Sequence, residues 1–517
     1  MTENERRSLP LWKRIIAILF GITLLAAQGA LLYFLYIFYA IYTTSNQSVV
    51  GYIYLGIEVY SVFHVLYVIH KPMSTNYKLT WSILILALPV FFVPVYFFNS
   101  TSRRLSKRKR NKIHKAIELI PSKTDIDELA DKDLYGYNFA KILADETFAP
   151  TYSDSKYVFF KNCEEKYKDM IEEIKKARDY VYLEFFIIAK GQLMDELYET
   201  LLAKGKEGVI IRILYDDVGS LKGSLRKLVK KIAKIPNCEI AKYQPLGLNF
   251  NFLANYRDHR KITVIDGIIA YCGGDNLADE YIHKKERFGY WRDNCGKFIG
   301  RCAFTFTVLF SEMWYTSTKK LVTYNPKQEY KVFKNEGYIV PFGDGPLYKS
   351  NSAYDLFTSM ISKARKSLYI STPYFIIDDT MINLIALKCK EGVDVRILMP
   401  KIPDKKMPFY MGRENYREIL KYGGKIYEFT PGFNHAKNII VDNKYAFIGT
   451  INMDYRSLFL HYECGALIID SKEIYDMCAD FLDTLNDSEL VSYEIWKKRP
   501  LYQKLIAFIL NLFAPMF

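Results

Sequence analysis

The pattern His-x-Lys-x-x-x-x-Asp occurs twice in this 517-residue chain, as "HRKITVID" at 259–266 and as "HAKNIIVD" at 435–442. Other phrases repeat in the same order around it. "KARDYVYLEFFII" matches "KARKSLYISTPYFII", and "KEGVIIRIL" matches "KEGVDVRIL". Single matches of this kind arise by chance, but a series in one order does not. The sequence therefore indicates an internal duplication that produces two similar domains.

Helical and strand patterns alternate within each copy. Residues 164–179 place apolar side chains at helical spacing, residues 180–188 form a short apolar run rich in β-formers, and the same alternation follows in 192–216. Alternation at this pitch is typical of layered α/β domains. We therefore predict two α-β-α sandwich domains, at residues 151–330 and 331–490, whose motifs face a shared cleft.

Three apolar segments precede the duplication, at residues 15–42, 49–69 and 79–98. The first has no charge and exceeds the roughly 20 residues that cross a bilayer core. A cleaved signal peptide is the alternative for this segment, but its apolar run continues well past the small residues "AAQGA". The second segment contains Glu58 and the third contains two prolines, so either can be tilted, kinked or only partly inserted.

Basic residues crowd the stretch "RRLSKRKRNKIHK" at 103–115, directly after the apolar segments, and the formal net charge of the chain is +14. Such a charge suits nucleic acid or an acidic membrane surface, and the apolar segments favour the membrane. Positive charge also marks the cytoplasmic side. The basic N-terminus prefers that side too, and both preferences cannot hold if all three segments span, so either the N-terminus lies outside or one segment is re-entrant. We expect residues 1–115 to form a membrane anchor of two or three helices, and 116–150 a linker.

The C-terminal stretch at 491–517 ends in "LYQKLIAFILNLFAPMF". As a helix it places Gln503, Lys504 and Asn511 on one face and apolar residues on the others, and it is too short to span a membrane comfortably. We interpret it as an interfacial amphipathic helix. Packing against the protein's own domains is the alternative.

Both motifs continue, at identical intervals, into a second strand. The residues 14, 15 and 17 positions after each histidine are Gly273, Gly274 and Asn276 in the first copy and Gly449, Thr450 and Asn452 in the second. Residues two apart in a strand share a face, so each histidine and its lysine project together, and a returning hairpin strand brings the asparagine alongside.

This set of side chains suits a phosphate. Lysine supplies a cation, asparagine supplies neutral donors, and a glycine corner can approach an anion closely. Imidazole can act as a nucleophile or a proton carrier near neutral pH. We predict a catalytic set, His259, Lys261, His435 and Lys437, and a phosphate-binding set, Asn276, Asn452, Gly274 and Thr450.

Four acidic residues accompany the motifs. Asp266 and Asp442 belong to the motifs and are included with the catalytic set, although their odd separation from the histidines points them to the other strand face and favours a structural or turn-forming role. Asp293 and Glu463 each introduce a strand-like run, and we predict that each orients the histidine of its own copy. Ordinary strand-end carboxylates are the alternative for this pair.

The remaining histidines and the cysteines carry no such pattern. We interpret the former as surface or satisfied core residues: His64, His70, His114, His283 and His461. The eight cysteines show no Cys-x-x-Cys pair and no metal-ligand spacing. We predict reduced thiols, no structural disulfide and no metal site.

The two extended motifs resemble the paired HKD motifs of the phospholipase D superfamily. With its apolar N-terminal segments and the phrases "WRDN", "GTINMDYRSL" and "RPLYQKL", the whole chain resembles bacterial cardiolipin synthases. This resemblance implies that His259 attacks the phosphate of phosphatidylglycerol to form a phosphatidyl-histidine, while His435 protonates the departing glycerol. His435 then activates a hydroxyl of a second phosphatidylglycerol, which gives cardiolipin. No metal, nucleotide or other cofactor is implied.

The resemblance also implies a multi-pass protein of the bacterial cell membrane, with catalytic domains on the cytoplasmic side and membrane phospholipids, not nucleic acid, as partners. Asp217 and Ser220 follow a strand and can touch a lipid headgroup, but stay outside the predicted site. Several alternatives remain. A phospholipase D-type hydrolase or a transferase with another alcohol acceptor uses the same residues. A membrane-tethered nuclease leaves the apolar segments unexplained, and a noncatalytic scaffold does not need two intact motifs.

Overall fold

The computed structural model describes residues 33, 47–71, 75–100, 124–220, 225–244, 256–322, 330–334, 336–348 and 350–514. Most of the first predicted apolar segment, 15–42, and the whole basic stretch 103–115 lie outside these residues. The chain divides into two compact units. The first is built mainly from residues 1–102, and the second contains nearly all the rest, including both motifs.

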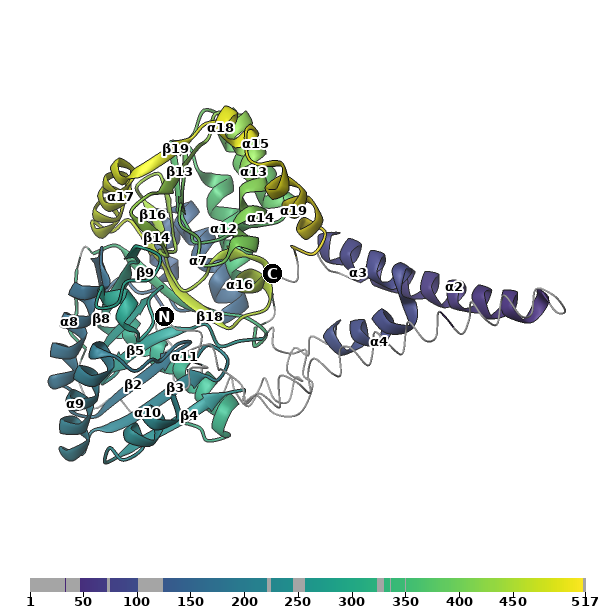
Figure 1. Cartoon of the computed structure of the whole chain (residues 1–517). Coiled ribbons are helices and arrows are strands. Elements are labelled where there is room, and N and C mark those ends of the chain that lie inside the picture. The colour runs from purple at the N-terminus through teal and green to yellow at the C-terminus, as the bar shows by residue number, and fades with distance from the viewer. Residues whose placement is uncertain are drawn as a thin grey trace. The chain divides into compact units, whose positions relative to one another are not determined.

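Three helices form the described part of the N-terminal unit: α2 (Gln47–Ile69), α3 (Thr75–Ala87) and α4 (Pro89–Ser100) (Figure 1). Within the described part of the chain, one stretch is long and apolar enough to cross a membrane, Gly51–Ile69 in α2, with a mean hydropathy of 1.5. The third predicted segment is broken just before Pro89, and α4 contains Pro94. A break here follows from proline, which removes a helix hydrogen bond and disfavours helical geometry in the residue before it.

The second unit contains two large mixed sheets whose strands follow one order. The first sheet runs β1 (Lys156–Phe160), β8 (Cys295–Ile299), β6 (Ile269–Gly273), β5 (Lys261–Ile265), β2 (Tyr180–Phe185), β3 (Ile210–Asp216) and β4 (Cys238–Tyr243). The second runs β9 (Tyr338–Asp344), β18 (Glu463–Ile469), β16 (Tyr445–Gly449), β15 (Asn438–Val441), β10 (Ser367–Ser371), β12 (Asp394–Pro400), β13 (Lys425–Phe429) and β19 (Ser488–Val491). Apart from β19 the two orders are equivalent, so the duplication predicted from the repeated phrases is present in the fold.

Each sheet has three neighbouring parallel strands, β2-β3-β4 and β10-β12-β13, followed on the β5 or β15 side by antiparallel strands; in the second sheet β19 also pairs antiparallel with β13. Every residue of β2 is buried, as is every residue of β10. Continuous burial is expected of parallel strands covered on both faces. It explains why these strands read as unbroken apolar runs rather than as alternating patterns.

Equivalent helices cover the two sheets. α8 (Cys163–Lys175) and α9 (Gln192–Lys206) pack on the first sheet, and α12 (Ser352–Lys363) and α13 (Asp379–Lys390) on the second (Figure 1). Two further helices lie between the sheets, α11 (Arg301–Thr318) and α17 (Glu473–Thr484). Every residue of α11 from 302 to 314 is buried, as expected for a helix that is apolar all round.

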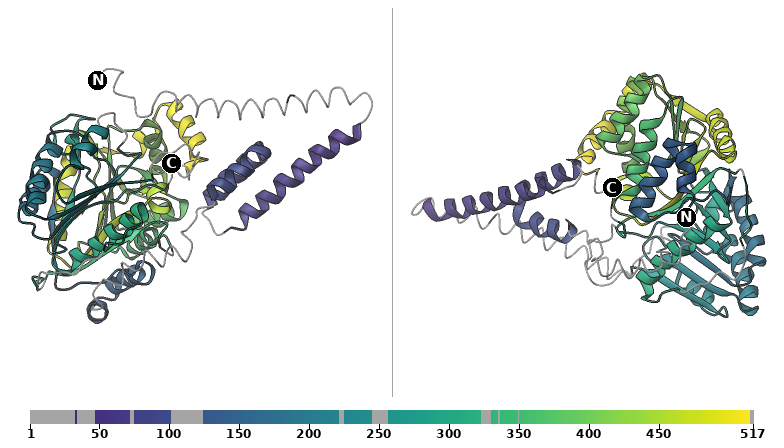
Figure 2. Two further views of the ribbon diagram at one scale, coloured as in Figure 1. Left: turned by 90° about the horizontal axis from the view of Figure 1, so that it is seen from below. Right: turned by 180° about the vertical axis from the view of Figure 1, so that it is seen from behind.

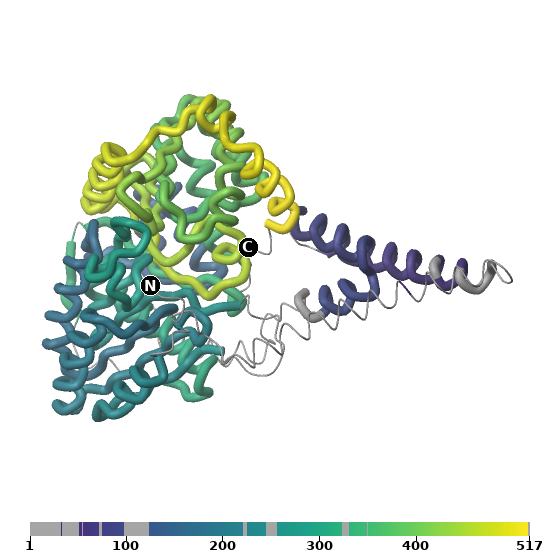
Figure 3. The backbone as a smooth tube through the Cα atoms, in the orientation of Figure 1, coloured from purple at the N-terminus to yellow at the C-terminus, as the bar shows by residue number. Residues whose placement is uncertain are grey.

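One hydrophobic core is shared by the two halves. It joins Ile262 and Val264 of β5 to Ala446 and Ile448 of β16 through the buried faces of α11 and α17. The halves form two lobes, blue to teal and green to yellow, that meet along this seam (Figures 2 and 3).

The other elements are α6 (Ile126–Lys132), α7 (Leu134–Thr147), α10 (Leu225–Ile232), a 3₁₀ turn η4 (Asp279–Ile282), β7 (Tyr290–Arg292), β11 (Phe375–Ile376), α14 (Lys406–Glu414), α15 (Tyr416–Lys421), β14 (Gly432–Asn434), β17 (Met453–Asp454), α16 (Tyr455–Phe459), η5 (Leu485–Asp487), α18 (Tyr493–Lys497) and α19 (Leu501–Asn511). Among them, β7 of the first half pairs with β14 of the second. This small ladder crosses the seam directly before the second motif.

The C-terminal helix α19 packs against α14, as the Tyr410 and Tyr502 rings, 6.2 Å apart, illustrate. Ala507 of α19 is buried, whereas Leu505 and Phe508 are 58% and 70% exposed. The alternative of packing on the protein's own domain is therefore correct for one face of the helix. An interfacial role for the exposed apolar face stays a prediction.

Candidate active site

Each motif histidine is hydrogen-bonded to a carboxylate from the other half of the chain. His259 Nδ1 lies 2.8 Å from Oε1 of Glu463, and His435 Nδ1 lies 2.6 Å from Oδ2 of Asp293. The pairing of each carboxylate with the histidine of its own copy was wrong. The carboxylates do contact the motif histidines, but across the seam.

Backbone hydrogen bonds explain the crossing. The N–H of His259 donates to the carbonyl of Tyr462 (2.9 Å), and the N–H of His435 donates to the carbonyl of Arg292 (2.7 Å). The first residue of each motif is therefore bonded to the backbone of the opposite half. Its partner, Tyr462 or Arg292, directly precedes the carboxylate residue, Glu463 or Asp293. A carboxylate from the opposite half is the one within reach.

These carboxylates are held in place by the residue that follows Gly273 or Gly449 in each hairpin. A Cβ atom at Gly274 would lie only 2.2 Å from Oδ1 of Asp293, so glycine leaves the space that this carboxylate occupies. At the equivalent position in the second copy, the Thr450 hydroxyl donates to Glu463 Oε2 and accepts from the Cys464 N–H (3.0 Å). Both residues were predicted to bind phosphate. The contacts that they make here are with the histidine-bound carboxylates.

Lys261 and Lys437 are buried beside the histidines. The Lys261 ammonium donates to the carbonyl of His259 at 2.5 Å, and Lys437 donates to the carbonyl of His435. Burial lowers the pKa of Lys261, and it lowers the pKa of Lys437 to about 8. An anion bound between the lysines would favour their charged forms.

Both histidines are neutral in this environment. Burial, followed by the neighbouring Lys261 and Lys437, holds the pKa of His259 and of His435 well below the usual value of 6.5. An ionised carboxylate can only accept, so beside one the proton of a neutral imidazole is on Nδ1 and the lone pair of Nε2 is available to attack. Burial raises the pKa of Asp293 to about 7, although Lys437 opposes this. The Asp293–His435 pair can therefore hold an extra proton near neutral pH.

The two asparagines differ from each other. In Asn276, Oδ1 accepts from the Ile187 N–H (3.0 Å) and Nδ2 donates to the Tyr281 hydroxyl (2.7 Å), so its amide holds the fold together. In Asn452, the buried Oδ1 has no hydrogen-bond partner among the described residues. The repeat predicted the same role for both asparagines. Their positions in the hairpins are equivalent, but their hydrogen bonds are not.

The motif aspartates bind backbone N–H groups. Asp266 accepts from the N–H groups of residues 178, 179 and 180, each at 2.8 Å, where β2 begins. Asp442 accepts from residues 365, 366 and 367, where β10 begins. Both aspartates have positive φ angles, 53° and 56°, as the turn-forming interpretation requires. These contacts support the structural role rather than the catalytic one.

His461 is a site residue that the sequence did not indicate. Its ring lies 5.4 Å from that of His259, and its side chain is only 11% exposed. Neither ring nitrogen has a hydrogen-bond partner among the described residues. The interpretation of His461 as a surface or satisfied core residue was therefore wrong. The one signal in the sequence was that His461 stands two positions before Glu463.

Of the two loop residues left outside the predicted site, Ser220 braces the loop. Its hydroxyl accepts from the Ile188 N–H at 3.0 Å and donates to the Phe186 carbonyl at 3.1 Å. Asp217 forms a 3.5 Å ion pair with Lys242.

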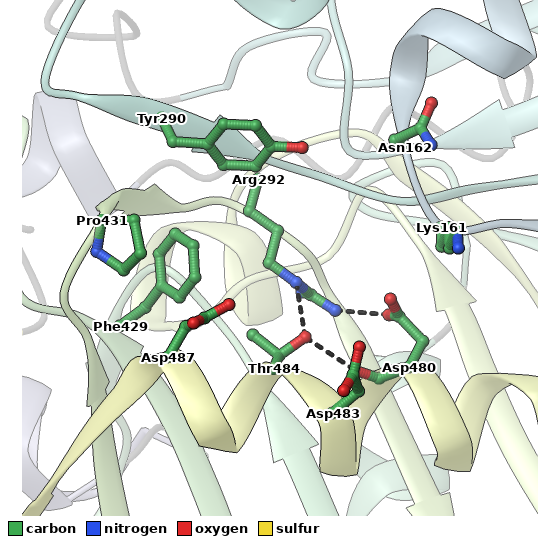
Figure 4. A pocket seen from close by; sticks show the side chains of 10 residues that line it. All are labelled: Lys161, Asn162, Tyr290, Arg292, Phe429, Pro431, Asp480, Asp483, Thr484 and Asp487. Atoms are coloured by element: carbon green, nitrogen blue, oxygen red, sulfur yellow. Dashed lines mark hydrogen bonds and ion pairs between the residues drawn. The ribbon is translucent and has the colours of Figure 1, made fainter.

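A cavity of about 330 Å³ lies beside the β7–β14 ladder (Figure 4). Arg292 points into it and binds Thr484 Oγ1 at 3.0 Å and the Asp480 carboxylate. The same guanidinium donates to Asn434 Oδ1 at 3.0 Å, directly before His435. Neither motif histidine is among the residues that line this cavity.

In the part of the chain that the structure describes, two groups of side chains have the donor atoms for a metal ion, with all ligand atoms of each group within 4.8 Å of one another: His259, His461 and Glu463, and Cys163, Asp275 and Cys295. In the first group, Lys261 and Lys437 contribute positive charge that disfavours a further cation. In the second, Asp275 is already paired with the buried Lys166 at 2.8 Å. The geometry therefore favours an anion between the motif histidines.

A family model described as a cardiolipin synthase, PLD-like domain matches residues 170–287 and 357–485, one segment in each half. Fold and site thus define a phospholipase D-like protein. The solved structure of a phosphatidylserine synthase from Haemophilus influenzae has the same fold, with a TM-score of 0.54 at 17% identity over 73% of this chain and 97% of that one.

Relatives in sequence narrow the class. A cardiolipin synthase from Alkalihalophilus pseudofirmus is 32% identical over 85% of this chain and 88% of its own length. Cardiolipin synthase 2 from Bacillus anthracis is 33% identical over 85% and 86%. An uncharacterized protein from Streptococcus mutans is 36% identical over 87% and 99%. The chain belongs to the cardiolipin synthase family.

Proposed function

We propose that this protein transfers a phosphatidyl group from one phosphatidylglycerol to another and so makes cardiolipin and glycerol. The observation that carries the proposal is the pair of crossed histidine–carboxylate contacts, which brings two neutral imidazoles and two buried lysines to one seam. A single phosphoryl group placed there meets a nucleophile, a separate proton carrier and two cations.

The first step forms a covalent intermediate. Nε2 of His259 attacks phosphorus, the bond from phosphorus to the headgroup oxygen breaks, and the Asp293–His435 pair supplies a proton to the departing glycerol. Lys261 and Lys437 stabilise the negative charge on the phosphoryl oxygens. The carboxylate of Glu463 holds the Nδ1 proton of His259 and stabilises the positive charge that the ring gains.

The second step reverses these roles. A terminal hydroxyl of another phosphatidylglycerol gives its proton to His435 and attacks phosphorus, which breaks the bond to His259 and releases cardiolipin. Hydrolysis would need only water in place of that hydroxyl. Lipid as the acceptor therefore requires a site that lies at the bilayer.

Membrane attachment supplies that location. The apolar α2, the basic stretch at 103–115 and the exposed apolar face of α19 are the features that support it. We propose a multi-pass protein of the bacterial cell membrane with both halves of the duplication on the cytoplasmic side. Its partners are then phosphatidylglycerol and cardiolipin.

The test is product analysis. Purified protein is incubated with phosphatidylglycerol vesicles, and lipids and water-soluble products are identified by mass spectrometry. Equimolar cardiolipin and glycerol is the expected result, with His259→Ala inactive and the exposed His70→Ala unchanged. Phosphatidic acid as the main product would show a hydrolase instead.

The intermediate provides a second test. With phosphatidylglycerol labelled at phosphorus, a quench at high pH, where phosphohistidine survives, should leave label on residue 259. Label on residue 435 would exchange the two roles.

A further inference from the structure

The third histidine, His461, is placed close to the reacting atoms with its hydrogen-bonding groups unused. Its backbone is held at the end of α16, where its N–H donates to the Arg456 carbonyl at 2.8 Å. Its Nδ1 lies 3.5 Å from Oε1 of Glu463, but that oxygen already bonds to His259 at 2.8 Å. Both ring nitrogens of His461 lack a hydrogen-bond partner among the described residues. Buried polar atoms are rarely left so, and such an atom beside a reactive group points to a ligand.

The charge state of His461 decides which ligand groups it can bind. Burial, followed by the positive charges of Arg456 and Lys261, holds the pKa of His461 well below the usual value. A neutral imidazole offers one N–H donor and one nitrogen acceptor. A hydroxyl group both donates and accepts, so it matches this pair of functions. A phosphate oxygen or an ammonium group uses only one of them.

The position of His461 relative to His259 indicates which hydroxyl it can bind. With ring centroids 5.4 Å apart, His461 lies beside His259, the residue whose Nε2 would carry the phosphorus. In the glycerol headgroup, the neighbouring hydroxyl is on the carbon next to the one that bears the reacting oxygen, so only a few bonds separate it from phosphorus. That neighbouring hydroxyl is present both in the leaving glycerol and in the attacking headgroup.

We infer that His461 binds the hydroxyl adjacent to the reacting one and thereby selects vicinal diol headgroups over water and simple alcohols. This inference rests on the proposed phosphatidyl transfer. It goes beyond it by naming a specificity residue and the group that this residue recognises.

The experiment compares two small acceptors that differ in one hydroxyl, 1,2-propanediol and 1-propanol. Wild-type protein is given labelled phosphatidylglycerol with each alcohol in excess, and the phosphatidyl-alcohol products are measured. The wild type should prefer the diol by about tenfold or more, since a buried site made for a hydroxyl is left unpaired by the analogue that lacks it. His461→Phe should reduce the preference to about one while transfer to 1-propanol stays within a few-fold.

Matched variants separate recognition from structure. His461→Asn keeps a donor and an acceptor and should retain most of the diol preference. A phenylalanine variant that loses transfer to both alcohols equally, or one that keeps the full preference, would overturn the inference. So would inhibition of the wild type by micromolar Zn²⁺ that His461→Phe abolishes without any change in preference, since His461 would then serve as a metal ligand.

The proposed function fails in a different way. If the wild type forms phosphatidic acid and no cardiolipin from phosphatidylglycerol alone, phosphatidyl transfer to lipid is refuted. The ratio of the two propanol products still reports on His461 in that case.

Discussion

Glu463 and Asp293 each serve a histidine that belongs to the other half, so their replacement should affect different chemical steps. Glu463→Gln should slow formation of the phosphatidyl-enzyme by roughly 10²- to 10⁴-fold, because an amide can donate to Nδ1 and leave the proton on Nε2, the attacking atom. Rapid-quench measurement of label bound to the protein tests this.

Two comparisons make that test specific. The exposed Glu489→Gln should leave the rate unchanged. Asp293→Asn should slow glycerol release and cardiolipin formation through His435. Normal accumulation of the intermediate in Glu463→Gln would contradict the role given to Glu463.

Titration of the Asp293–His435 pair should set the alkaline side of the pH profile. The proton needed by the leaving glycerol is held with a pKa of about 7, while His259, with its pKa well below 6.5, is already neutral. The pair loses this proton as pH rises, so kcat/KM should be highest below pH 7 and fall through about pH 7. Initial rates in detergent micelles between pH 5 and 9 measure this.

Lys437 provides the control for the profile, since its pKa of about 8 lies close by. Lys437→Arg stays charged throughout and should leave the fall near pH 7 in place. A fall that moves above pH 9 in this variant would assign the titration to the lysine.

At this scale the sequence predicted the motif histidines and lysines, because equal spacing in two copies identifies them without any structure. It could not predict which carboxylate serves which histidine. That choice depends on how the halves pack, and nothing within one copy reports it. The sequence did not identify His461 as a site residue, because a histidine without a counterpart in the other copy has no repeated pattern to distinguish it.

Among the elements, the starts of β2 and β10 depend on the motif aspartates. Asp266→Ala leaves three backbone N–H groups without their acceptor, one of them in the buried Tyr180, and should destabilise the fold by about 2–4 kcal/mol. Asp442→Ala should cost less, since the N–H groups of Arg365 and Lys366 are exposed and water can replace the carboxylate.

Thermal unfolding followed by circular dichroism tests this order. The exposed Asp476→Ala is the matched control and should leave the midpoint unchanged. Loss of activity in Asp442→Ala without any loss of stability would restore a catalytic role to that residue.

The alternation of helices and strands was readable because apolar periodicity is a local property. The break between α3 and α4 was signalled by Pro89, and prolines act through their immediate neighbours. The contact of α19 with α14 was harder to predict from the sequence. An amphipathic helix has the same pattern whether its partner is a lipid surface or another helix, and α19 uses one face on the protein while Leu505 and Phe508 stay exposed.

For the whole molecule, the exposed face of α19 should matter only when substrate lies in a bilayer. Replacing Leu505 and Phe508 together with Glu removes two apolar side chains that are each worth about 1.5–3 kcal/mol when buried. The ratio of activity in proteoliposomes to activity in detergent micelles should fall by about tenfold or more. Tyr475→Glu, at a site 63% exposed on α17, should not change this ratio. Equal losses in vesicles and micelles would show that α19 serves the fold and not the membrane.

The crossing of the carboxylates makes the two copies of the domain interdependent. Each half lends an acid to the histidine of the other, through Asp293 in one direction and Glu463 in the other. After most duplications one copy is free to decay. Here both copies supply a histidine and a carboxylate to one site, so the loss of either residue from either copy would disable that single site. The two halves therefore cannot change independently at these positions, and selection acts on the shared seam rather than on either domain.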